Sequence, residues 1–476
     1  MVQRIVVLIF SAVLIVCDCF GQNIPHQLEM AMQKLIADEQ FKHASTSLYV
    51  IDGKTGKLIF EKNSLLGMAP ASCQKIVTSV SAFEILGKGY QYKTYIDCDL
   101  PISNGVLKGN LYITGGGDPT PGSSRWNTTG EWVVLKKILS ILQKNKIQTI
   151  AGNLVCNDTR FTNESLPHGW IWEDIGNYYG AGAWGFNWRE NQFDLTFTTG
   201  KKLNDPTTIA STKPTSIMKD YVFANFVTTG SKGSGDHGFL YSAPFQKNII
   251  ARGTVPVSEN GFTISGSMPD PPGTFIKMLK GYLNENGIKV SGETWTNSER
   301  QLNNQPVSLP RVHLDSIASP PLDSINYWFL KKSVNLFGEA LVKTIAFEKS
   351  TYGSTDTGIA IIKDFWSKRG IEKSALKIID GSGLSPANRV TTHSLVTILQ
   401  YAKGQPWFAS FYNALPEMNG IKMKDGYIGG VRSYTGYIKS KNGSDYTFAF
   451  IVNNFDGSPA TVREKMWKVL NLLTDN

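Results

Sequence analysis

The spacing of hydrophobic residues predicts strands and amphipathic helices at both ends of the chain. Residues 46–63, TSLYVIDGKTGKLIFEKN, contain two strand-like runs around a turn with Asp52-Gly53, as in a β-hairpin. Residues 68–87 then place apolar side chains at helical spacing and end at Gly87, so we expect a helix there. The same spacing predicts further helices at 131–147, 325–349, about 355–370 and about 459–473.

The middle of the chain has a different pattern. From about 150 to 270, Gly, Thr, Ser and Asn become frequent and long helical patterns disappear, which predicts a β-rich region. Residues 274–292 return to a helix followed by a strand and loosely resemble 135–152, either as a duplicated unit or as two ordinary αβ pieces of one domain. Both ends of the chain have helix and strand patterns, and the middle has a different one. We therefore expect an α+β fold in which one domain is interrupted by an insertion.

The first 21 residues have the pattern of a signal peptide. A short basic start, MVQR, precedes the apolar run IVVLIFSAVLIV, and the small residues Cys19 and Gly21 predict cleavage after Gly21. Cys17 leaves lipoprotein anchoring as an alternative, although Val16 before it is bulkier than such a site prefers. We therefore expect an exported, periplasmic protein whose mature chain has no transmembrane segment.

Composition narrows the class of protein. Of the five cysteines, Cys73, Cys98 and Cys156 stay after cleavage, so at most one disulfide can form and the fold depends on its hydrophobic core. The 48 basic and 39 acidic residues give a formal charge of +9, spread along the chain. In an exported protein this excludes nucleic acid as an expected partner, and indicates either a solvated basic surface or contact with an anionic wall polymer or membrane.

Ser72 and Lys75 lie three residues apart at the start of the apolar segment 68–87. Residues at this spacing share one face of a helix. A serine hydroxyl becomes a nucleophile when a neighbour removes its proton, and a lysine can do so when its pKa is lowered by burial. The pattern S-x-x-K also occurs at 216–219 and 374–377, but only Ser72 begins a strongly apolar helix after a hairpin.

Other catalytic chemistries lack their motifs in this sequence. The six histidines form no H-E-x-x-H or other metal-ligand spacing, and there is no G-x-S-x-G element. The segment GGGDP at 115–119 lacks the Lys and Ser/Thr of a phosphate-binding loop. Serine–lysine enzymes carry S-x-x-K, S-x-N and K-T-G in chain order, and Ser333-Val334-Asn335 fits the second element.

At this point five ordered blocks resemble those of one family, the class C low-molecular-mass penicillin-binding proteins, which are D-alanyl-D-alanine carboxypeptidases and endopeptidases. The blocks are PASCQKIVTSVSAFEILG, LYITGGGDPT, INYWFLKKSVNLFGEAL, DGSGLSPANRVTTHSL and GGVRSYTGYI. The resemblance extends from about residue 45 to the C-terminus.

The resemblance implies a penicillin-binding transpeptidase-like domain, an antiparallel sheet flanked by helices and interrupted by inserted domains. It would comprise 22–97 and 312–476, with β-rich accessory domains at 98–311. It also implies a peptidoglycan stem peptide as substrate, β-lactams as inhibitors, and neither metal nor organic cofactor. The reaction would transfer an acyl group from D-alanine to water.

The resemblance also implies roles for individual residues. Ser72 would be the acylated nucleophile, and its backbone N–H would form half of the oxyanion hole. Lys75 would be the general base. Ser333 would relay a proton to the leaving amine, and Asn335 would hold the peptide through its side-chain amide. The block DGSGLS at 380–385 would shape the surroundings of the site.

The third motif departs from the family pattern. A literal Lys-Thr-Gly occurs at 54–56, but it lies before Ser72 in the turn of the hairpin. At the expected position the sequence has Lys424-Asp425-Gly426, followed by Tyr427. Lys424 would meet the substrate carboxylate, Gly426 would let backbone approach backbone, and the N–H of Tyr427 would complete the oxyanion hole. Asp425 replaces a hydroxyl donor by an anion, which Lys424 could neutralise or which could point away from the site.

The altered third motif leaves more than one function open. The chain is either an active DD-peptidase, with activity reduced by Asp425, or a peptidoglycan-binding paralogue that has lost turnover. A β-lactamase-like hydrolase is a third possibility, disfavoured by the length of the chain and by the lack of a deacylating Glu in the sequence pattern. The aromatic segment 170–188 either stacks on sugar rings or, as we favour, packs inside the insertion.

Overall fold

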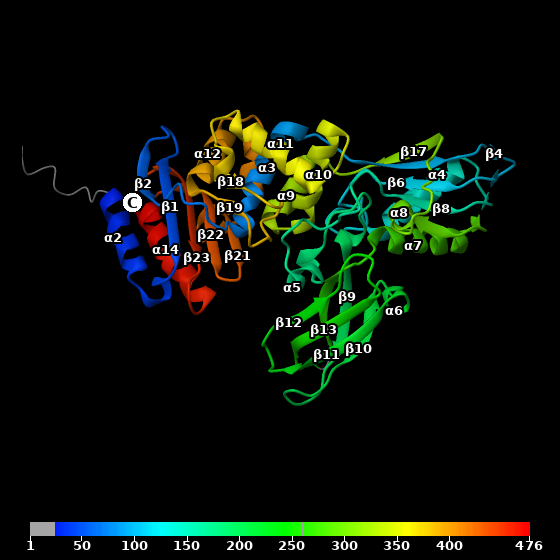
Figure 1. Cartoon of the computed structure of the whole chain (residues 1–476), viewed down its shortest axis with the longest axis horizontal. Coiled ribbons are helices and arrows are strands. Elements are labelled where there is room, and N and C mark those ends of the chain that lie inside the picture. The colour runs from blue at the N-terminus through cyan, green and yellow to red at the C-terminus, as the bar shows by residue number, and fades with distance from the viewer. Residues whose placement is uncertain (1–23, 259) are drawn as a thin grey trace, which may run out of the picture.

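The computed structural model describes residues 24–258 and 260–476, so the predicted signal peptide and Cys17 lie outside the described residues. The chain forms an α+β fold, as predicted, and Figure 1 shows three regions: a sheet and helices built from both ends of the chain, an accessory αβ region, and a small β-sandwich. No helix among the described residues has the length and apolar character needed to cross a bilayer.

The first region is built on a six-stranded antiparallel sheet that joins the two ends of the chain. Its strands, in spatial order, are β2 (Leu58–Lys62), β1 (Ser45–Asp52), β23 (Asp445–Asn453), β22 (Val431–Lys439), β21 (Ile421–Ile428) and β20 (Glu417–Met418). β1 and β2 form the predicted hairpin, and the Lys-Thr-Gly at 54–56 lies in its turn, where Asp52 accepts hydrogen bonds from the N–H groups of residues 54 and 55. The register of β1 against β23 runs from Ser45↔Asn453 to Asp52↔Tyr446.

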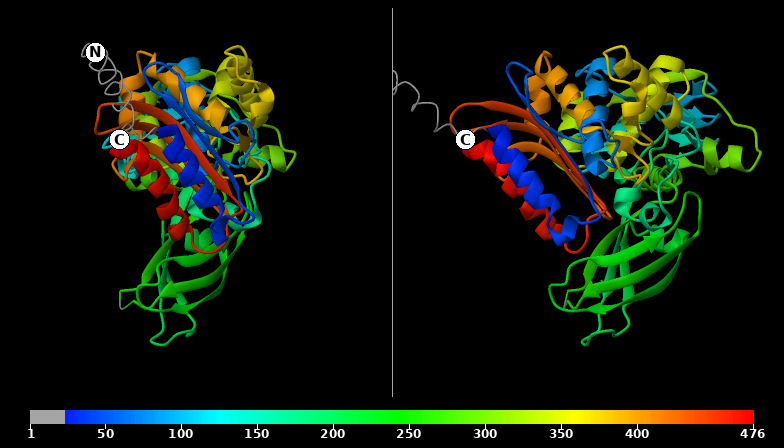
Figure 2. Two further views of the ribbon diagram at one scale, coloured as in Figure 1. Left: turned by 90° about the vertical axis from the view of Figure 1, so that its left-hand side faces the viewer. Right: turned by 60° about the vertical axis from the view of Figure 1, so that its left-hand side comes forward.

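Helices cover both faces of this sheet. One face packs against α2 (Ile24–Ile36) and α14 (Pro459–Asp475), which lie side by side in Figure 2. The opposite face carries the helical core of this region, made of α3 (Lys75–Leu86), α9 (Leu322–Lys331), α10 (Asn335–Ser350), α11 (Thr355–Ser367), α12 (Thr392–Lys403) and α13 (Phe408–Ala414). The short strands β18 (Leu376–Lys377) and β19 (Arg389–Val390), and the 3-10 turns η1 (Glu39–Phe41) and η5 (Lys373–Ala375), complete this region. The amphipathic pattern explains this layering, because each helix buries its apolar face against the sheet or a neighbouring helix.

The accessory region contains two sheets around one core. The five-stranded sheet has the order β16 (Thr294–Thr296), β8 (Leu154–Asn157), β6 (Leu111–Thr114), β3 (Lys93–Cys98) and β17 (Val312–Ala318). The four-stranded sheet has the order β15 (Lys289–Val290), β7 (Thr149–Ile150), β5 (Val106–Leu107) and β4 (Ile102–Ser103). Helices α4 (Glu131–Lys144), α7 (Pro271–Glu285) and α8 (Asn297–Leu302) pack on these sheets, so the two predicted αβ pieces share one core.

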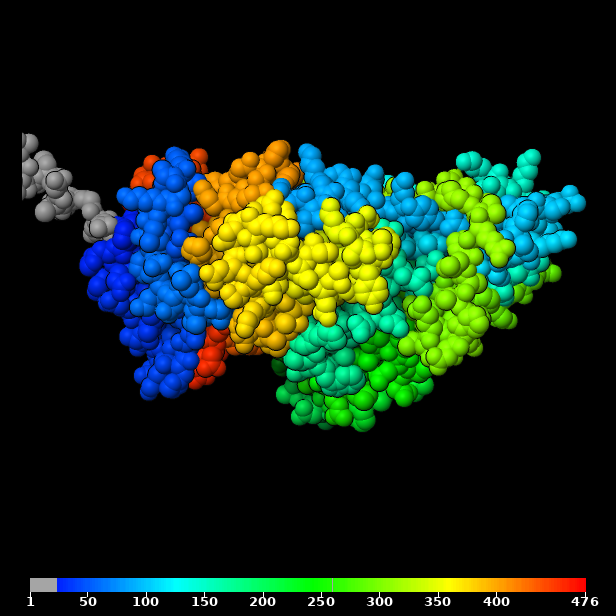
Figure 3. Space-filling view, turned by 45° about the horizontal axis from the view of Figure 1, so that its top comes forward, coloured from blue at the N-terminus to red at the C-terminus, as the bar shows by residue number. Residues whose placement is uncertain are grey.

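The β-rich middle of the chain forms a sandwich of two three-stranded sheets with its own core. One sheet is β10 (Thr208–Lys213), β9 (Gln192–Thr198) and β14 (Phe262–Ser267), and the other is β11 (Val222–Gly230), β13 (Asn248–Pro256) and β12 (His237–Tyr241). The helices of this stretch are short: α5 (Trp172–Ile175), α6 (Ile217–Asp220), η3 (Tyr178–Gly180) and η4 (Arg189–Asn191). The sandwich projects from the lower edge of the molecule (Figure 3).

The structure refines three sequence-based expectations. The helix expected at 325–349 is two helices, because the backbone turns at Lys332–Val334 and Ser333 adopts a left-handed φ of 54° that an α-helix cannot contain. Cys73, Cys98 and Cys156 are buried free thiols, so the optional disulfide is not formed. The domain boundaries expected at 97/98 and 311/312 stay a prediction. Because β3 and β17 pair within the accessory sheet, we propose that the accessory region extends outward to about residues 92 and 319.

Candidate active site

The structure brings Ser72 and Lys75 into contact at the start of the buried helix. Ser72 lies in the 3-10 turn η2 (Ala71–Gln74), and Lys75 is the first residue of α3. Residues three apart in a 3-10 turn lie on the same side, and the Lys75 Nζ donates to the Ser72 Oγ at 3.0 Å. Ala71, directly before the serine, has a left-handed φ of 45°, a strained conformation of the kind that functional sites retain.

The environment of Lys75 lowers the pKa of its amine. Its Nζ is buried and donates to the Asn335 Oδ1 at 2.6 Å and to the Ser382 carbonyl at 2.7 Å. Burial, followed by the positive charge of Lys424, lowers its pKa from 10.5 to about 7. A neutral amine is therefore available beside the serine at ordinary pH, which is the requirement for a general base.

The predicted S-x-N element lies at the junction of α9 and α10. Asn335 begins α10 and is held from both sides, because its Oδ1 accepts from Lys75 and its Nδ2 donates to the Tyr179 carbonyl at 2.8 Å. Ser333 lies two residues earlier, half-buried, in the left-handed turn. The Lys75 Nζ makes hydrogen bonds with Ser72, Asn335 and Ser382, and Ser333 is not one of these three partners.

Strand β21 runs beside Ser72 and carries the third motif. A Cβ on Gly426 would lie 2.9 Å from the Ser72 nitrogen and 2.6 Å from the Pro70 carbonyl, so only glycine fits here. The Met423 N–H donates to the Pro416 carbonyl on the side away from β22. N–H groups two residues apart point to the same edge of a strand, so the N–H of Tyr427, four residues after Met423, points to this edge as well. The neighbouring strand β20 pairs with Ile421 and Lys422 and does not reach Tyr427.

Lys424 is paired with its neighbour Asp425. The Lys424 Nζ lies 2.8 Å from the Asp425 Oδ1 and also donates to the Asp425 carbonyl at 2.8 Å. The Lys424 side chain is 1% exposed and that of Asp425 is 33% exposed. Burial alone would raise the pKa of Asp425, but the charges of Lys424 and Arg432 and the Lys424 hydrogen bond outweigh it and lower the pKa. Of the two sequence-based alternatives, the carboxylate therefore points toward the lysine.

A buried loop holds Lys75 from behind. In segment 380–385, Asp380 accepts hydrogen bonds from the N–H groups of Gly383 and Ser385, which rigidifies the loop that presents the Ser382 carbonyl. The predicted role of this block, shaping the surroundings of the site, agrees with this geometry. Trp170 from the aromatic segment also donates to Asp380, at 2.8 Å.

Sequence reasoning missed Glu339, one turn after Asn335 on α10. Its Oε2 accepts from the Gly381 N–H at 3.0 Å, and burial together with the charge of Asp380 raises its pKa to about 8. The available signal was the position of a charged residue within the apolar run LFGEALV, because a buried charge needs a partner or a function.

Cys73, next to the nucleophile, does not compete with it. Its thiol is buried and donates to the Lys424 carbonyl at 3.2 Å. Burial raises the pKa of this thiol to about 12, so it stays protonated and unreactive at neutral pH.

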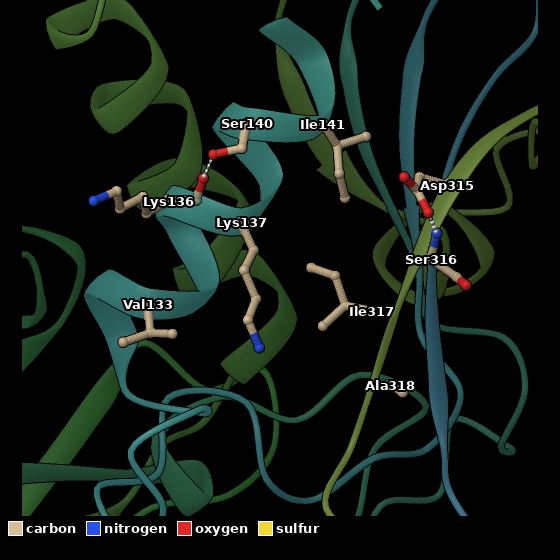
Figure 4. A pocket seen from close by; sticks show the side chains of 9 residues that line it. All are labelled: Val133, Lys136, Lys137, Ser140, Ile141, Asp315, Ser316, Ile317 and Ala318. Atoms are coloured by element: carbon tan, nitrogen blue, oxygen red, sulfur yellow. Dashed lines mark hydrogen bonds between the residues drawn. The ribbon is translucent and has the colours of Figure 1, made fainter. Parts of the chain in front are cut away.

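One hollow of the described chain lies away from these residues. It is an open groove of about 530 Å³ between α4 and β17 in the accessory region (Figure 4). Of the α4 residues that line this groove, Ser140 carries a hydroxyl, which donates to the Lys136 carbonyl of the same helix. The groove contains none of the motif residues, and among the described residues no group of three or more His, Cys, Asp or Glu is placed to hold a metal.

Comparisons with known proteins identify the family of the chain. Residues 28–418 match the model of the D-Ala-D-Ala carboxypeptidase 3 (S13) family. The chain is 26% identical over 463 residues to a D-alanyl-D-alanine carboxypeptidase of Actinomadura sp. (strain R39), covering 91% of this chain and 82% of that protein. It is 24% identical to the D-alanyl-D-alanine carboxypeptidase DacB of Haemophilus influenzae, covering 84% and 83%.

The fold is also similar to a solved structure. The crystal structure of penicillin-binding protein 4 (dacB) from Haemophilus influenzae matches with a TM-score of 0.79 and 20% identity, covering 94% of this chain and 99% of that one. The family resemblance proposed from the five sequence blocks is thus confirmed. The chain belongs to the D-Ala-D-Ala carboxypeptidase 3 (S13) family and is an enzyme of that kind.

Proposed function

We propose that the chain is an exported, periplasmic serine DD-peptidase that hydrolyses D-Ala-D-Ala stem peptides, D-Ala cross-links of peptidoglycan, or both, through an acyl-enzyme on Ser72. The contact of 3.0 Å between the Lys75 amine and the Ser72 hydroxyl carries this proposal. Export rests on the signal-peptide pattern of residues 1–21.

In the proposed reaction, Lys75 takes the proton of Ser72 while the Oγ attacks the carbonyl carbon of the penultimate D-alanine. The N–H groups of Ser72 and Tyr427 stabilise the oxyanion, and Asn335 holds the peptide. Ser333 passes a proton to the nitrogen of the leaving D-alanine as the C–N bond breaks. Water then hydrolyses the ester and regenerates the Ser72 hydroxyl.

The ion pair of Lys424 and Asp425 favours a second candidate, a catalytically weakened peptidoglycan-binding paralogue. In the proposed enzyme, Lys424 receives the terminal carboxylate of the substrate. A carboxylate already bonded to that lysine competes with the substrate, and repels it by several kcal/mol at a few ångströms and an effective dielectric near 20, before screening. A substrate without a free carboxylate at this point would avoid the conflict.

Labelling with a fluorescent penicillin, followed by mass spectrometry of the labelled peptide, tests the proposal. A structure of the Haemophilus influenzae relative holds a β-lactam, which makes this class of probe appropriate. We expect a label on Ser72 that is released slowly. Rapid turnover of the penicillin would instead indicate a β-lactamase-like hydrolase, and complete absence of label would favour the paralogue.

A further inference from the structure

The two sheets of the β-sandwich differ in the side chains that they expose. Along β9 and β14, the outward positions alternate with the buried ones and carry Asp194, Thr196, Thr263 and Ser265. Such polar residues are usual on the outer face of a sandwich. The outer face of the opposite sheet differs from this polar face.

The outward face of the other sheet carries a cluster of apolar and aromatic side chains. Val222 and Phe226 on the edge strand β11 are 65% and 58% exposed. Their inward neighbours belong to the sandwich core, so these side chains point to solvent by strand alternation. Cross-strand pairing places Phe226, Arg252 and Phe239 in one row across the sheet, and the Arg252 guanidinium lies over the Phe226 ring at 5.0 Å.

The apolar surface continues toward the active site through Tyr241 and Trp172. Tyr241 lies on the same face of β12 as Phe239, and its ring centroid is 6.0 Å from that of Trp172 on α5. Trp172 is 50% exposed, so this ring of the aromatic segment 170–188 does not pack inside the insertion as favoured from the sequence, whereas Trp184 and Trp188 are buried. We call the set Val222, Phe226, Arg252, Phe239, Tyr241 and Trp172 the aromatic face.

Hydrogen bonds connect the aromatic face to the catalytic residues. The Asn177 side chain accepts from the Leu240 N–H of β12 at 3.0 Å, and the Gly176 carbonyl accepts from the Ser267 N–H of β14 at 2.9 Å. Two residues further along, the Tyr179 carbonyl accepts from Asn335. The segment that carries Trp172 is therefore fixed to the sandwich at one point and to the active site at another, with α5 lying between them in Figure 1.

We propose that the aromatic face binds the glycan strand of peptidoglycan, an inference that rests on the proposed substrate. Flat exposed rings stack on the apolar faces of pyranose rings, and Arg252 adds hydrogen-bond donors for their hydroxyl and carboxylate oxygens. Strands about 4.8 Å apart place the side chains of one row at a regular spacing, which offers a repeating contact for a polymer. The stem peptide is attached to the glycan, so a strand held here keeps further peptides near Ser72.

A binding measurement with peptide-free glycan strands tests the proposal without depending on catalysis. We expect wild type to bind these strands and Phe226→Ala and Trp172→Ala each to weaken binding about tenfold, the effect of one lost stacking contact. Trp132→Ala is the matched control, because this tryptophan is 67% exposed but lies on α4 in the accessory region. It should bind like wild type.

A second measurement compares substrates. Phe226→Ala should hydrolyse a short free stem peptide like wild type, but should lose kcat/KM on glycan-linked peptides. Failure of wild type to bind glycan, or equal binding by Phe226→Ala and wild type, would overturn the proposal while leaving penicillin labelling of Ser72 as a separate result. Binding to vesicles of anionic phospholipid in place of glycan, lost in Phe226→Ala, would also overturn it and assign the face to a membrane surface.

Discussion

Two buried lysines of the site have different hydrogen-bond partners. Lys75 lies beside Ser72, in what we call the first half of the site, and Lys424 lies on β21, in the second half. Among the described residues, the hydrogen bonds of the Lys75 amine go to neutral oxygens, those of Ser72, Asn335 and Ser382. Lys424 contacts the carboxylate of Asp425. A buried amine without a bonded carboxylate loses its proton easily, and burial followed by the charge of Lys424 lowers the pKa of Lys75 to about 7. The same residue type is thus suited to be a base in one half and the partner of a carboxylate in the other.

The most severe test of the first half is Ser72→Ala. This change removes the hydroxyl that the Lys75 amine contacts, so penicillin labelling and peptidase activity should be abolished. Loss of one hydroxyl at a helix start costs at most about 1–2 kcal/mol of stability, so the protein should stay folded. Mass spectrometry and thermal unfolding check both points. Residual acylation on another serine would contradict the assignment.

Replacing Lys75 tests whether its neutral amine is the base. Lys75→Ala should reduce the acylation rate by about 10²–10⁴-fold, the usual contribution of a general base. Lys75→Arg should not restore activity, because a guanidinium keeps its proton in proteins. Stopped-flow acylation measures both variants beside Lys332→Ala, an exposed lysine near the site that should be neutral in effect. Near-normal acylation by the arginine variant would exclude a base at this position.

The pH dependence of acylation sharpens the contrast between the lysines. The pKa of Lys75 is lowered to about 7, so the neutral base predominates above pH 7 and its fraction falls about tenfold per pH unit well below it. Acylation should therefore rise with pH and level off above about pH 7. Because the charge of Lys424 lowers the pKa of Lys75, Lys424→Met should shift the rise to higher pH. A profile that is flat from pH 5 to 8 would contradict the assignment.

The same comparison shows what the sequence could predict. The Ser72–Lys75 pair was predictable because both residues belong to one local turn with fixed spacing. The hairpin and most helices followed from periodicity in the same way. The break between α9 and α10 was not predictable, because residues 325–349 keep helical spacing across Ser333, and the left-handed turn depends on tertiary packing. The contacts of Lys75 with Asn335 and Ser382 were also hidden, since these residues are 260 and 307 positions away in the chain.

The smallest expected effect tests the second half of the site. Asp425→Thr removes the carboxylate that occupies Lys424 and supplies a hydroxyl donor, so a substrate carboxylate gains one charge-assisted hydrogen bond and loses a repulsion. We expect acylation by a peptide ending in free D-alanine to rise about tenfold. The negative charge of Asp425 also raises the pKa of Lys75, so its removal should shift the pH profile slightly toward acid.

A matched pair of substrates makes this last test specific to the carboxylate. The same peptide with a C-terminal carboxamide carries no charge at that point, so Asp425→Thr should not accelerate its acylation. Asp425→Val, which has the branched shape of threonine but neither a charge nor a hydrogen-bond donor, separates repulsion from the missing hydroxyl. If repulsion dominates, Val improves the free-acid peptide nearly as much as Thr does; if the hydroxyl dominates, only Thr does. An unchanged or slower rate for both variants would show that the Lys424–Asp425 pair does not impede the reaction. Lys424 would then release Asp425 when the substrate carboxylate arrives, and the two halves of the site would be equally prepared for acyl transfer.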